Sequence, residues 1–87
     1  MFLEVSNANY IGEYKINLTF NDGKSLIVDL SDQLEGEIFK PLKDLAFFKL
    51  FSIKYNTIEW SNGADFAPEF LLELGKKQIV KKNRFAV

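Results

Sequence analysis

The chain has 87 residues, 47% of them hydrophobic, and a formal net charge of −1. It contains no cysteine and no histidine, which excludes disulfides, thiolate nucleophiles, histidine general bases and histidine-ligated transition metals. We therefore expect one small domain that is not an enzyme and holds no cofactor. Nine phenylalanines, three tyrosines and one tryptophan supply the large rings that a core of this size needs.

The beginning of the chain gives no targeting signal. It reads Met-Phe-Leu-Glu, without the basic region and apolar run of a signal peptide. No stretch approaches the roughly 18 apolar residues of a membrane span. We expect a cytoplasmic protein that has no membrane partner.

Charge is distributed unevenly along the chain. Residues 1–75 hold six lysines and twelve acidic residues, whereas residues 76–87 hold five cations and no acid. We therefore divide the chain into a compact domain, residues 1–75, and a basic C-terminal tail or arm, residues 76–87. This asymmetry is compatible with binding to nucleic acid or to an acidic protein, and also with self-neutralisation alone.

Alternating apolar residues predict strands in the first third of the chain. Residues 2–10 begin as a strand, with a bend or bulge at residues 7–9 and a turn at Gly12. Residues 14–20 alternate cleanly, and Asn21-Asp22-Gly23 fits a type I turn with the glycine in the left-handed position. This turn places the apolar residues of both strands on one face. The expected pairs are Phe20 with Lys24, Leu18 with Leu26, Ile16 with Val28, and Tyr14 with Leu30.

The middle of the chain is acidic and then aromatic. The acidic run at residues 28–37 lacks the spacing and glycine placement of a calcium loop, so we expect a solvated loop. Pro41 and Asp44 predict a short turn and then a helix over residues 44–50. Phe47 and Phe48 would lie about 100° apart on that helix. Either both belong to the core or one lies at an interface.

A second hairpin follows. Ile53 and Tyr55 are expected to pair with Ile58 and Trp60 across a two-residue link, Asn56-Thr57. The positive φ angles of a type I′ turn suit Asn56 but not the β-branched Thr57. This register is therefore weaker than that of the first hairpin.

Residues 57–69 combine a strand, a chain reversal and a helix start. Trp60 ends the alternating pattern, and Asn62-Gly63 then reverses the chain. Pro68 predicts a helix that begins near residue 67 or 68, because proline suits the first helical turn. We expect this corner to close the core, and we expect the helix to end at Gly75.

Asp65 has two interpretations. Its carboxylate caps the loop and the first helical turn, or it forms a polar recognition patch with Asn62 and Glu69 beside Trp60. Leu72 falls off the apolar face of the helix and could join a small contact patch. The candidate partner-binding residues are Trp60, Asn62, Asp65, Glu69 and Leu72.

The basic residues 76–87 also contain apolar side chains, among them Ile79 and Val80. Such a segment could follow phosphates as a nucleic-acid contact. It could instead be a disordered terminus, an added edge strand, or an arm that grips a second subunit. The candidate nucleic-acid contacts are Lys76, Lys77, Lys81, Lys82 and Arg84.

The run at residues 57–69, Thr-Ile-Glu-Trp-Ser-Asn-Gly-Ala-Asp-Phe-Ala-Pro-Glu, resembles the signature of the DUF2442 family of small bacterial domains. Residues 18–23, 28–30 and 39–44 are similar to the family's pattern as well, so the resemblance spans about residues 1–74. The family has no established biochemical role that could be transferred to a residue here. The resemblance implies association with a second small protein, in arrangements like those of toxins and antitoxins.

These observations predict an α+β fold, with an antiparallel sheet of about five strands packed against two short helices in the order β-β-β-α-β-β-α. We expect a non-enzymatic protein-binding module, such as the antitoxin-like or adaptor half of a bacterial two-protein system. Its partner would be another protein or a second copy of the chain. The alternative is a nucleic-acid-binding accessory protein that uses the basic tail.

Overall fold

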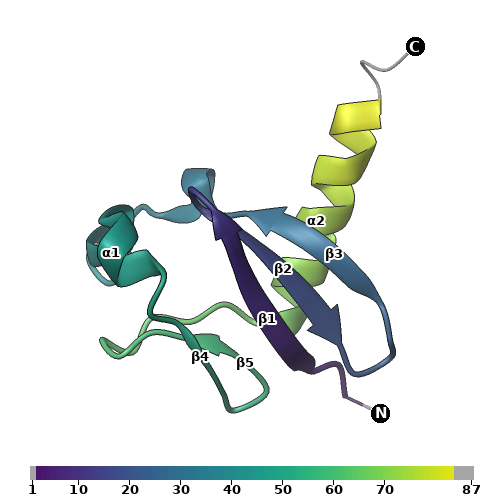
Figure 1. Ribbon diagram of the computed structural model, residues 1–87, viewed down its shortest axis with the longest axis horizontal. Helices are drawn as coiled ribbons and strands as arrows, with labels where there is room; N and C mark the ends of the chain where they lie inside the picture. The colour runs from purple at the N-terminus through teal and green to yellow at the C-terminus, as the bar shows by residue number, and fades with distance from the viewer. Residues whose placement is uncertain (1, 84–87) are drawn as a thin grey trace.

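A three-stranded antiparallel sheet forms one wall of the molecule (Figure 1). The computed structural model describes the backbone of residues 2–83 and the side chains of residues 2–80. Strands β1 (Val5–Gly12), β2 (Lys15–Phe20) and β3 (Ser25–Asp29) lie side by side in that order. The predicted register of β2 and β3 is confirmed, since Ile16 lies opposite Val28 and Leu18 opposite Leu26. Strand β1 carries two irregularities, one after Val5 and one after Tyr10.

Short helical turns connect the two sheets. They are η1 (Ser31–Gln33), η2 (Lys40–Lys43) and α1 (Leu45–Phe48). The Asp44 carboxylate caps α1 by accepting a hydrogen bond from the Ala46 amide at 3.1 Å. Phe48 is buried, and Phe47 packs against the core. The core interpretation of both rings is therefore confirmed.

Strands β4 (Ser52–Lys54) and β5 (Thr57–Glu59) form a separate two-stranded sheet. The predicted register of this hairpin is wrong, because Ile53 lies opposite Ile58 and the turn residues are Tyr55 and Asn56. Both turn residues have positive φ angles, 50° and 75°, as a type I′ turn requires. The shift by one residue moves Thr57 out of the turn. Thr57 is buried instead, and its hydroxyl donates to the Phe66 carbonyl.

Helix α2 (Pro68–Asn83) begins at the predicted proline but does not end at Gly75. Gly75 is buried against β3, where an added Cβ would lie 2.4 Å from Leu26 Cδ1. The glycine therefore permits close contact between helix and strand and does not act as a cap. Residues 76–83 continue the helix, so the predicted edge strand or disordered tail is wrong for them. Residues 84–87 lie outside the described residues.

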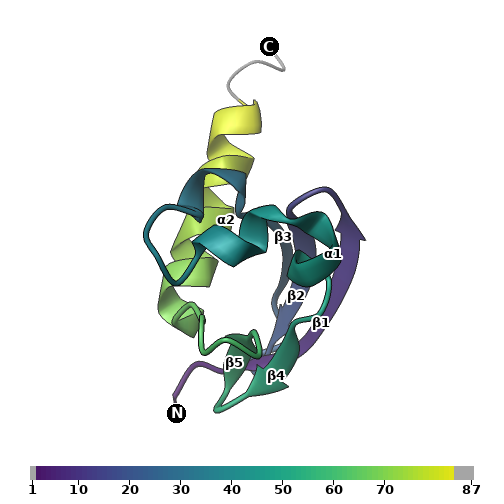
Figure 2. The same cartoon turned by 90° about the vertical axis from the view of Figure 1, so that its left-hand side faces the viewer.

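The core lies between the sheet and the remaining elements. Figure 2 shows α2 and the three-stranded sheet on opposite sides, with α1 at one end and the β4–β5 hairpin at the other. Five strands divided three and two, together with one main helix, confirm the α+β class. Among the described residues, none of the helices has the length and apolar character needed to cross a membrane. The largest fully buried side chains are Trp60, Phe20, Phe48, Ile16, Leu18, Leu30, Leu42, Ile58, Leu71 and Val28.

Candidate functional site

Trp60 is the centre of the predicted corner, and it is buried. Its side chain is 1% exposed, and its indole Nε1 donates a 2.8 Å hydrogen bond to the Phe48 carbonyl. The Trp60 amide donates to the Ala64 carbonyl at 2.9 Å, which closes the reversal. The corner therefore exists as predicted. Trp60 cannot contact a partner from inside the core, so it does not belong to an exposed recognition patch as predicted.

Asn62 uses its side chain to hold the same reversal. Its Oδ1 accepts a hydrogen bond from the Ala64 amide at 3.1 Å, and its Nδ2 donates to the Ile38 carbonyl at 2.9 Å. These bonds tie the corner to the segment before η2. Asn62 therefore has a structural role that sequence reasoning did not assign to it.

The other three residues of the predicted patch do not form one surface unit. Asp65 and Glu69 are exposed, and the Asp65 carboxylate accepts no hydrogen bond from the described residues, so it does not cap α2. Asp65 forms an isolated backbone bridge with Glu59. Leu72 is partly buried against the core, which corrects its expected exposure. Phe70 is the exposed apolar residue of this part of α2.

The predicted basic residues lie partly on the helix. Lys76 and Lys77 are exposed on α2 just beyond Gly75. Lys81 and Lys82 belong to the last turn of α2, and their side chains lie outside the description, as does all of Arg84. The candidate basic surface is therefore the projecting part of a helix (Figure 1).

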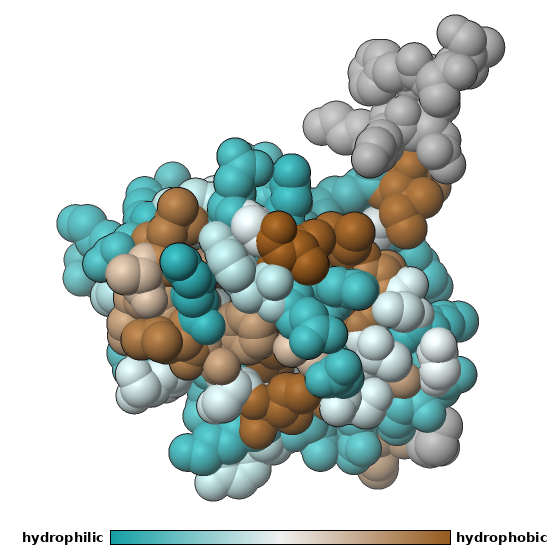
Figure 3. All heavy atoms as spheres, viewed as in Figure 1, coloured by the Kyte–Doolittle hydropathy of each residue, from teal (hydrophilic) through white to brown (hydrophobic). Residues whose placement is uncertain are grey.

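A hollow of about 850 Å³ opens where α2 passes the edge of β3, and sequence reasoning missed it. Three isoleucines in its lining are about half exposed: Ile27 at 51%, Ile11 at 47% and Ile79 at 47%. Figure 3 shows hydrophobic surface over β3 and again on the projecting end of α2, with polar residues around it. The remaining lining residues are Lys15, Asn17, Ser25, Leu26, Asp29 and Gln78.

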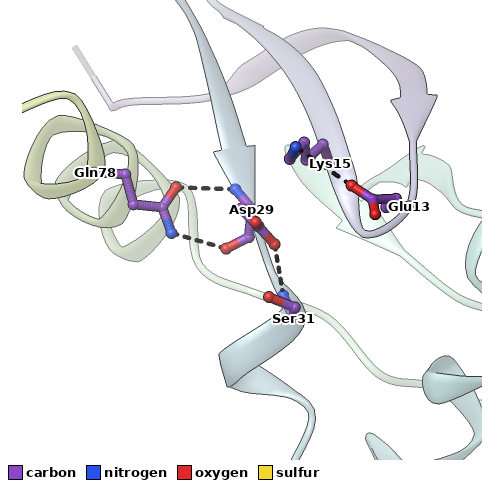
Figure 4. A network of polar contacts seen from close by, with 5 residues as sticks. All are labelled: Glu13, Lys15, Asp29, Ser31 and Gln78. Carbon is purple, nitrogen blue, oxygen red and sulfur yellow. Dashed lines mark hydrogen bonds and ion pairs between the residues drawn. The ribbon is translucent and has the colours of Figure 1, made fainter. Parts of the chain in front are cut away.

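Gln78 joins α2 to the edge of β3 (Figure 4). Its Oε1 accepts a hydrogen bond from the Asp29 amide at 2.9 Å, and its Nε2 donates to the Asp29 carbonyl at 2.8 Å. The Asp29 carboxylate in turn accepts from the Ser31 amide at 3.0 Å. The side-chain amide of Gln78 thus bonds both outward backbone groups of one strand residue.

The rest of the β3 edge is open. The Leu30 amide bonds the Tyr14 carbonyl at 2.9 Å, and the Phe20 amide bonds the Lys24 carbonyl at 2.8 Å. Hydrogen-bonded pairs alternate along an antiparallel ladder, so the backbone groups of Ser25 and Ile27 point away from β2. They have no hydrogen-bond partner among the described backbone of residues 2–83 and the described side chains of residues 2–80. The hollow therefore borders an unpaired strand edge.

Strand β1, the other edge of the sheet, is less suited to pairing. Its two irregularities interrupt the ladder, and bulges of this kind protect edges. Near its start, the Val5 amide donates to the Asn56 carbonyl of the β4–β5 turn at 2.8 Å. Regular pairing is therefore available at β3 and not at β1.

The sequence does carry one signal for this site. Ile27 and Ile11 occupy the outward positions of their strands, among residues such as Lys15, Asn17 and Ser25. An isoleucine on an otherwise polar face is not explained by the core. That β3 is an edge strand depends on strand order, which the sequence pattern does not specify.

The acidic side chains of the described residues are dispersed. Within the described residues, they do not gather in groups of three that could hold a metal ion. The hollow contains one carboxylate, Asp29, which is already hydrogen-bonded. Its chemistry is that of apolar contact and backbone hydrogen bonding.

Comparison with protein-family models gives one match. Residues 5–77 match the model of the family described as "Protein of unknown function (DUF2442)". The matched residues include both sheets, the Trp60 corner and α2 as far as Lys77. Comparisons with curated proteins and with solved structures give no match.

Proposed function

We propose, from the premise that the chain belongs to the DUF2442 family of proteins of unknown function, that it is a non-enzymatic protein-binding module. The observation that supports this proposal is the open edge of β3 beside an apolar hollow. An unpaired strand edge is a template for another chain. An exposed cluster of large apolar residues bordered by polar ones is typical of a protein contact surface.

The proposed partner is a second small protein. The resemblance of residues 57–69 to the family signature supports a role as the antitoxin-like or adaptor half of a bacterial two-protein system in the cytoplasm. The buried members of that run, such as Thr57, Ile58 and Trp60, hold the corner together, and the proposal leaves the partner contacts to other residues. The contacts are assigned to Ile27 and Ile79, on opposite sides of the hollow.

The test is affinity capture with matched variants. Tagged wild-type protein, Ile27→Lys and Asp65→Lys are used on the same cell lysate, after circular dichroism confirms that all are folded. We expect one companion protein to be retained by the wild type and by Asp65→Lys, and to be lost from Ile27→Lys. Retention of the companion by Ile27→Lys would contradict the proposed surface. Loss of the companion from Asp65→Lys alone would show that the binding site lies at the Trp60 corner and not at the hollow.

A nucleic-acid-binding role is the second candidate, because Lys76 and Lys77 are exposed on a projecting helix. Each phosphate contact would make binding weaker as salt rises. If these lysines contact phosphates, the double variant Lys76→Gln/Lys77→Gln should bind DNA or RNA more weakly than the wild type. Its binding should also depend less on salt concentration. If the wild type and the variant bind DNA or RNA equally weakly at physiological salt, the nucleic-acid-binding role is wrong.

A further inference from the structure

We infer that two copies of the chain pair through the outward face of α2, with the two helices antiparallel. The contact surface is the α2 stripe, which consists of Phe70, Glu73, Lys77 and Val80. This inference goes beyond the proposed function, because the stripe lies on a different side of α2 from the hollow. The occupant of the stripe is a second copy of the chain.

The four residues of the α2 stripe lie along one line of the helix. They are separated by three, four and three positions, the spacing at which side chains of one helix line up against a neighbouring helix. At 100° per residue they fall within roughly 80° of one another. The buried Leu71 and Gly75 lie on the other side of the helix. The stripe therefore faces away from the three-stranded sheet (Figure 2).

All four side chains of the stripe are accessible. Val80 is 61% exposed and Phe70 is 41% exposed, and Glu73 and Lys77 are exposed as well. Among the described side chains, those of residues 2–80, neither of these two charged groups forms an ion pair. The Phe70 ring is stacked on the Phe66 ring, with centroids 5.7 Å apart and planes inclined by 11°. Because the Phe70 ring is already held in place, its immobilisation costs less on binding.

The stripe is complementary to itself when its direction is reversed. Two antiparallel helices that cross at Gly75 place Phe70 opposite the partner's Val80, and Glu73 opposite the partner's Lys77. Both pairs have the same midpoint, Gly75, so one two-fold axis forms both pairs twice. A parallel arrangement would instead bring each charge next to its own copy, and such like-charge contacts are unfavourable.

The charges of α2 favour a second copy over an unrelated partner. The first half of the helix carries Glu69 and Glu73, and the next turn carries Lys76 and Lys77. A uniformly acidic or basic partner would attract one half of this face and repel the other. An antiparallel second copy brings the acidic half of each helix to the basic half of the other. Self-pairing therefore complements both signs of charge at once.

The experiment measures self-association of the full chain by analytical ultracentrifugation at low salt. We expect the wild type to dimerise below about 1 mM, with weak affinity because the contact is small, and we expect added salt to dissociate the dimer. Glu73→Lys and Lys77→Glu, each alone, turn both Glu–Lys contacts into like-charge contacts. Each variant should weaken dimerisation about tenfold or more, after circular dichroism confirms that it is folded.

An equimolar mixture of the two variants gives the sharpest comparison. When a Glu73→Lys chain pairs with a Lys77→Glu chain, a lysine faces a glutamate at both contacts again. We expect the mixture to dimerise at a concentration at which each variant alone is monomeric. A wild type that stays monomeric up to about 1 mM, or a mixture that associates no better than its components, overturns the inference.

A second mixture controls for net charge. Glu13→Lys and Lys24→Glu change exposed residues in the turns of the three-stranded sheet, and they alter net charge as the stripe variants do. We expect each of these variants alone, and their mixture, to dimerise like the wild type. Weakened dimerisation of each control variant, restored in their mixture, would show that overall charge and not the stripe causes association, and would overturn the inference.

Two adjacent residues on different sides of α2 test the apolar contacts. Val80 belongs to the stripe, whereas Ile79 borders the hollow. We expect Val80→Ser to weaken dimerisation about tenfold, because each dimer buries this side chain twice. Ile79→Ser should dimerise like the wild type. Dimerisation that is lost from Ile79→Ser and kept by Val80→Ser assigns self-association to the hollow and overturns the inference.

The outcomes separate this inference from the proposed function. Val80→Ser leaves Ile27 and Ile79 unchanged, so we expect it to retain the captured companion although it no longer dimerises. Dimerisation through the stripe in the absence of any companion supports the inference and not the proposed function. A companion captured by a wild type that never dimerises overturns the inference and leaves the proposed function intact.

Discussion

Gly75 and Leu26 touch so closely that a Cβ at Gly75 would lie 2.4 Å from Leu26 Cδ1. Alanine usually stabilises a helix interior by about 1 kcal/mol relative to glycine, but overpacking costs about 1 to 3 kcal/mol. We predict that Gly75→Ala lowers the free energy of unfolding by about 1 kcal/mol, measured by urea denaturation. The exposed control Lys77→Ala should change it by less than about 0.5 kcal/mol. Stabilisation by Gly75→Ala would contradict the close contact.

Thr57 anchors the start of β5 through its hydroxyl, which donates to the Phe66 carbonyl. Thr57→Val keeps the shape but leaves a carbonyl without its donor in the interior. We predict a loss of about 1 to 3 kcal/mol in stability. Thr57→Ser keeps the hydroxyl and removes one methyl group, which costs about 0.8 kcal/mol. If serine destabilised the protein more than valine, packing and not the hydrogen bond would be the main contribution of Thr57.

The β4–β5 turn contains a tyrosine in an unfavourable backbone conformation. Tyr55 has a φ of 50° and its side chain is 84% exposed. Left-handed conformation costs most residues about 1 to 2 kcal/mol, and asparagine adopts it more readily. We predict that Tyr55→Asn raises the melting temperature and stabilises the protein by about 0.5 to 1 kcal/mol. Tyr55→Phe serves as the control and should have no effect; a destabilised Tyr55→Asn would mean that the ring makes contacts worth more than the strain.

Asp44 and Asp65 should respond differently to substitution. Asp44 caps α1 through the Ala46 amide, so Asp44→Ala should lower the free energy of unfolding by about 1 kcal/mol. Asp65→Lys should change it by less than about 0.5 kcal/mol, because the Asp65 carboxylate is exposed and has no hydrogen-bond partner among the side chains and backbone that the structure describes. Chemical denaturation of both variants tests this difference. A large loss at Asp65 would restore the capping interpretation.

Local chemistry made much of the fold predictable. The β2–β3 register follows from two signals that agree, the Asn21-Asp22-Gly23 turn and strict alternation on both sides of it. The start of α2 follows from Pro68, whose backbone suits a first helical turn. In both places the physical cause lies within a few residues of sequence.

The errors arise where the cause is tertiary. A glycine near the expected end of a helix is compatible with a cap and with a close contact, and the choice at Gly75 depends on Leu26, far away in sequence. The β4–β5 register depends on Tyr55 adopting a conformation that tyrosine rarely adopts. The open edge at Ile27 depends on the order of strands in the sheet. No local pattern encodes these three relationships.

Residue-resolved amide hydrogen exchange, with and without the captured companion, tests the β3 binding surface most directly. In the free protein, the Ser25 and Ile27 amides should exchange fast, whereas the Val28 amide, which belongs to the ladder with β2, should exchange slowly. The companion should slow exchange at Ser25 and Ile27 markedly. If the companion binds but the Ser25 and Ile27 amides exchange as fast as in the free protein, the proposed β3 binding surface is wrong.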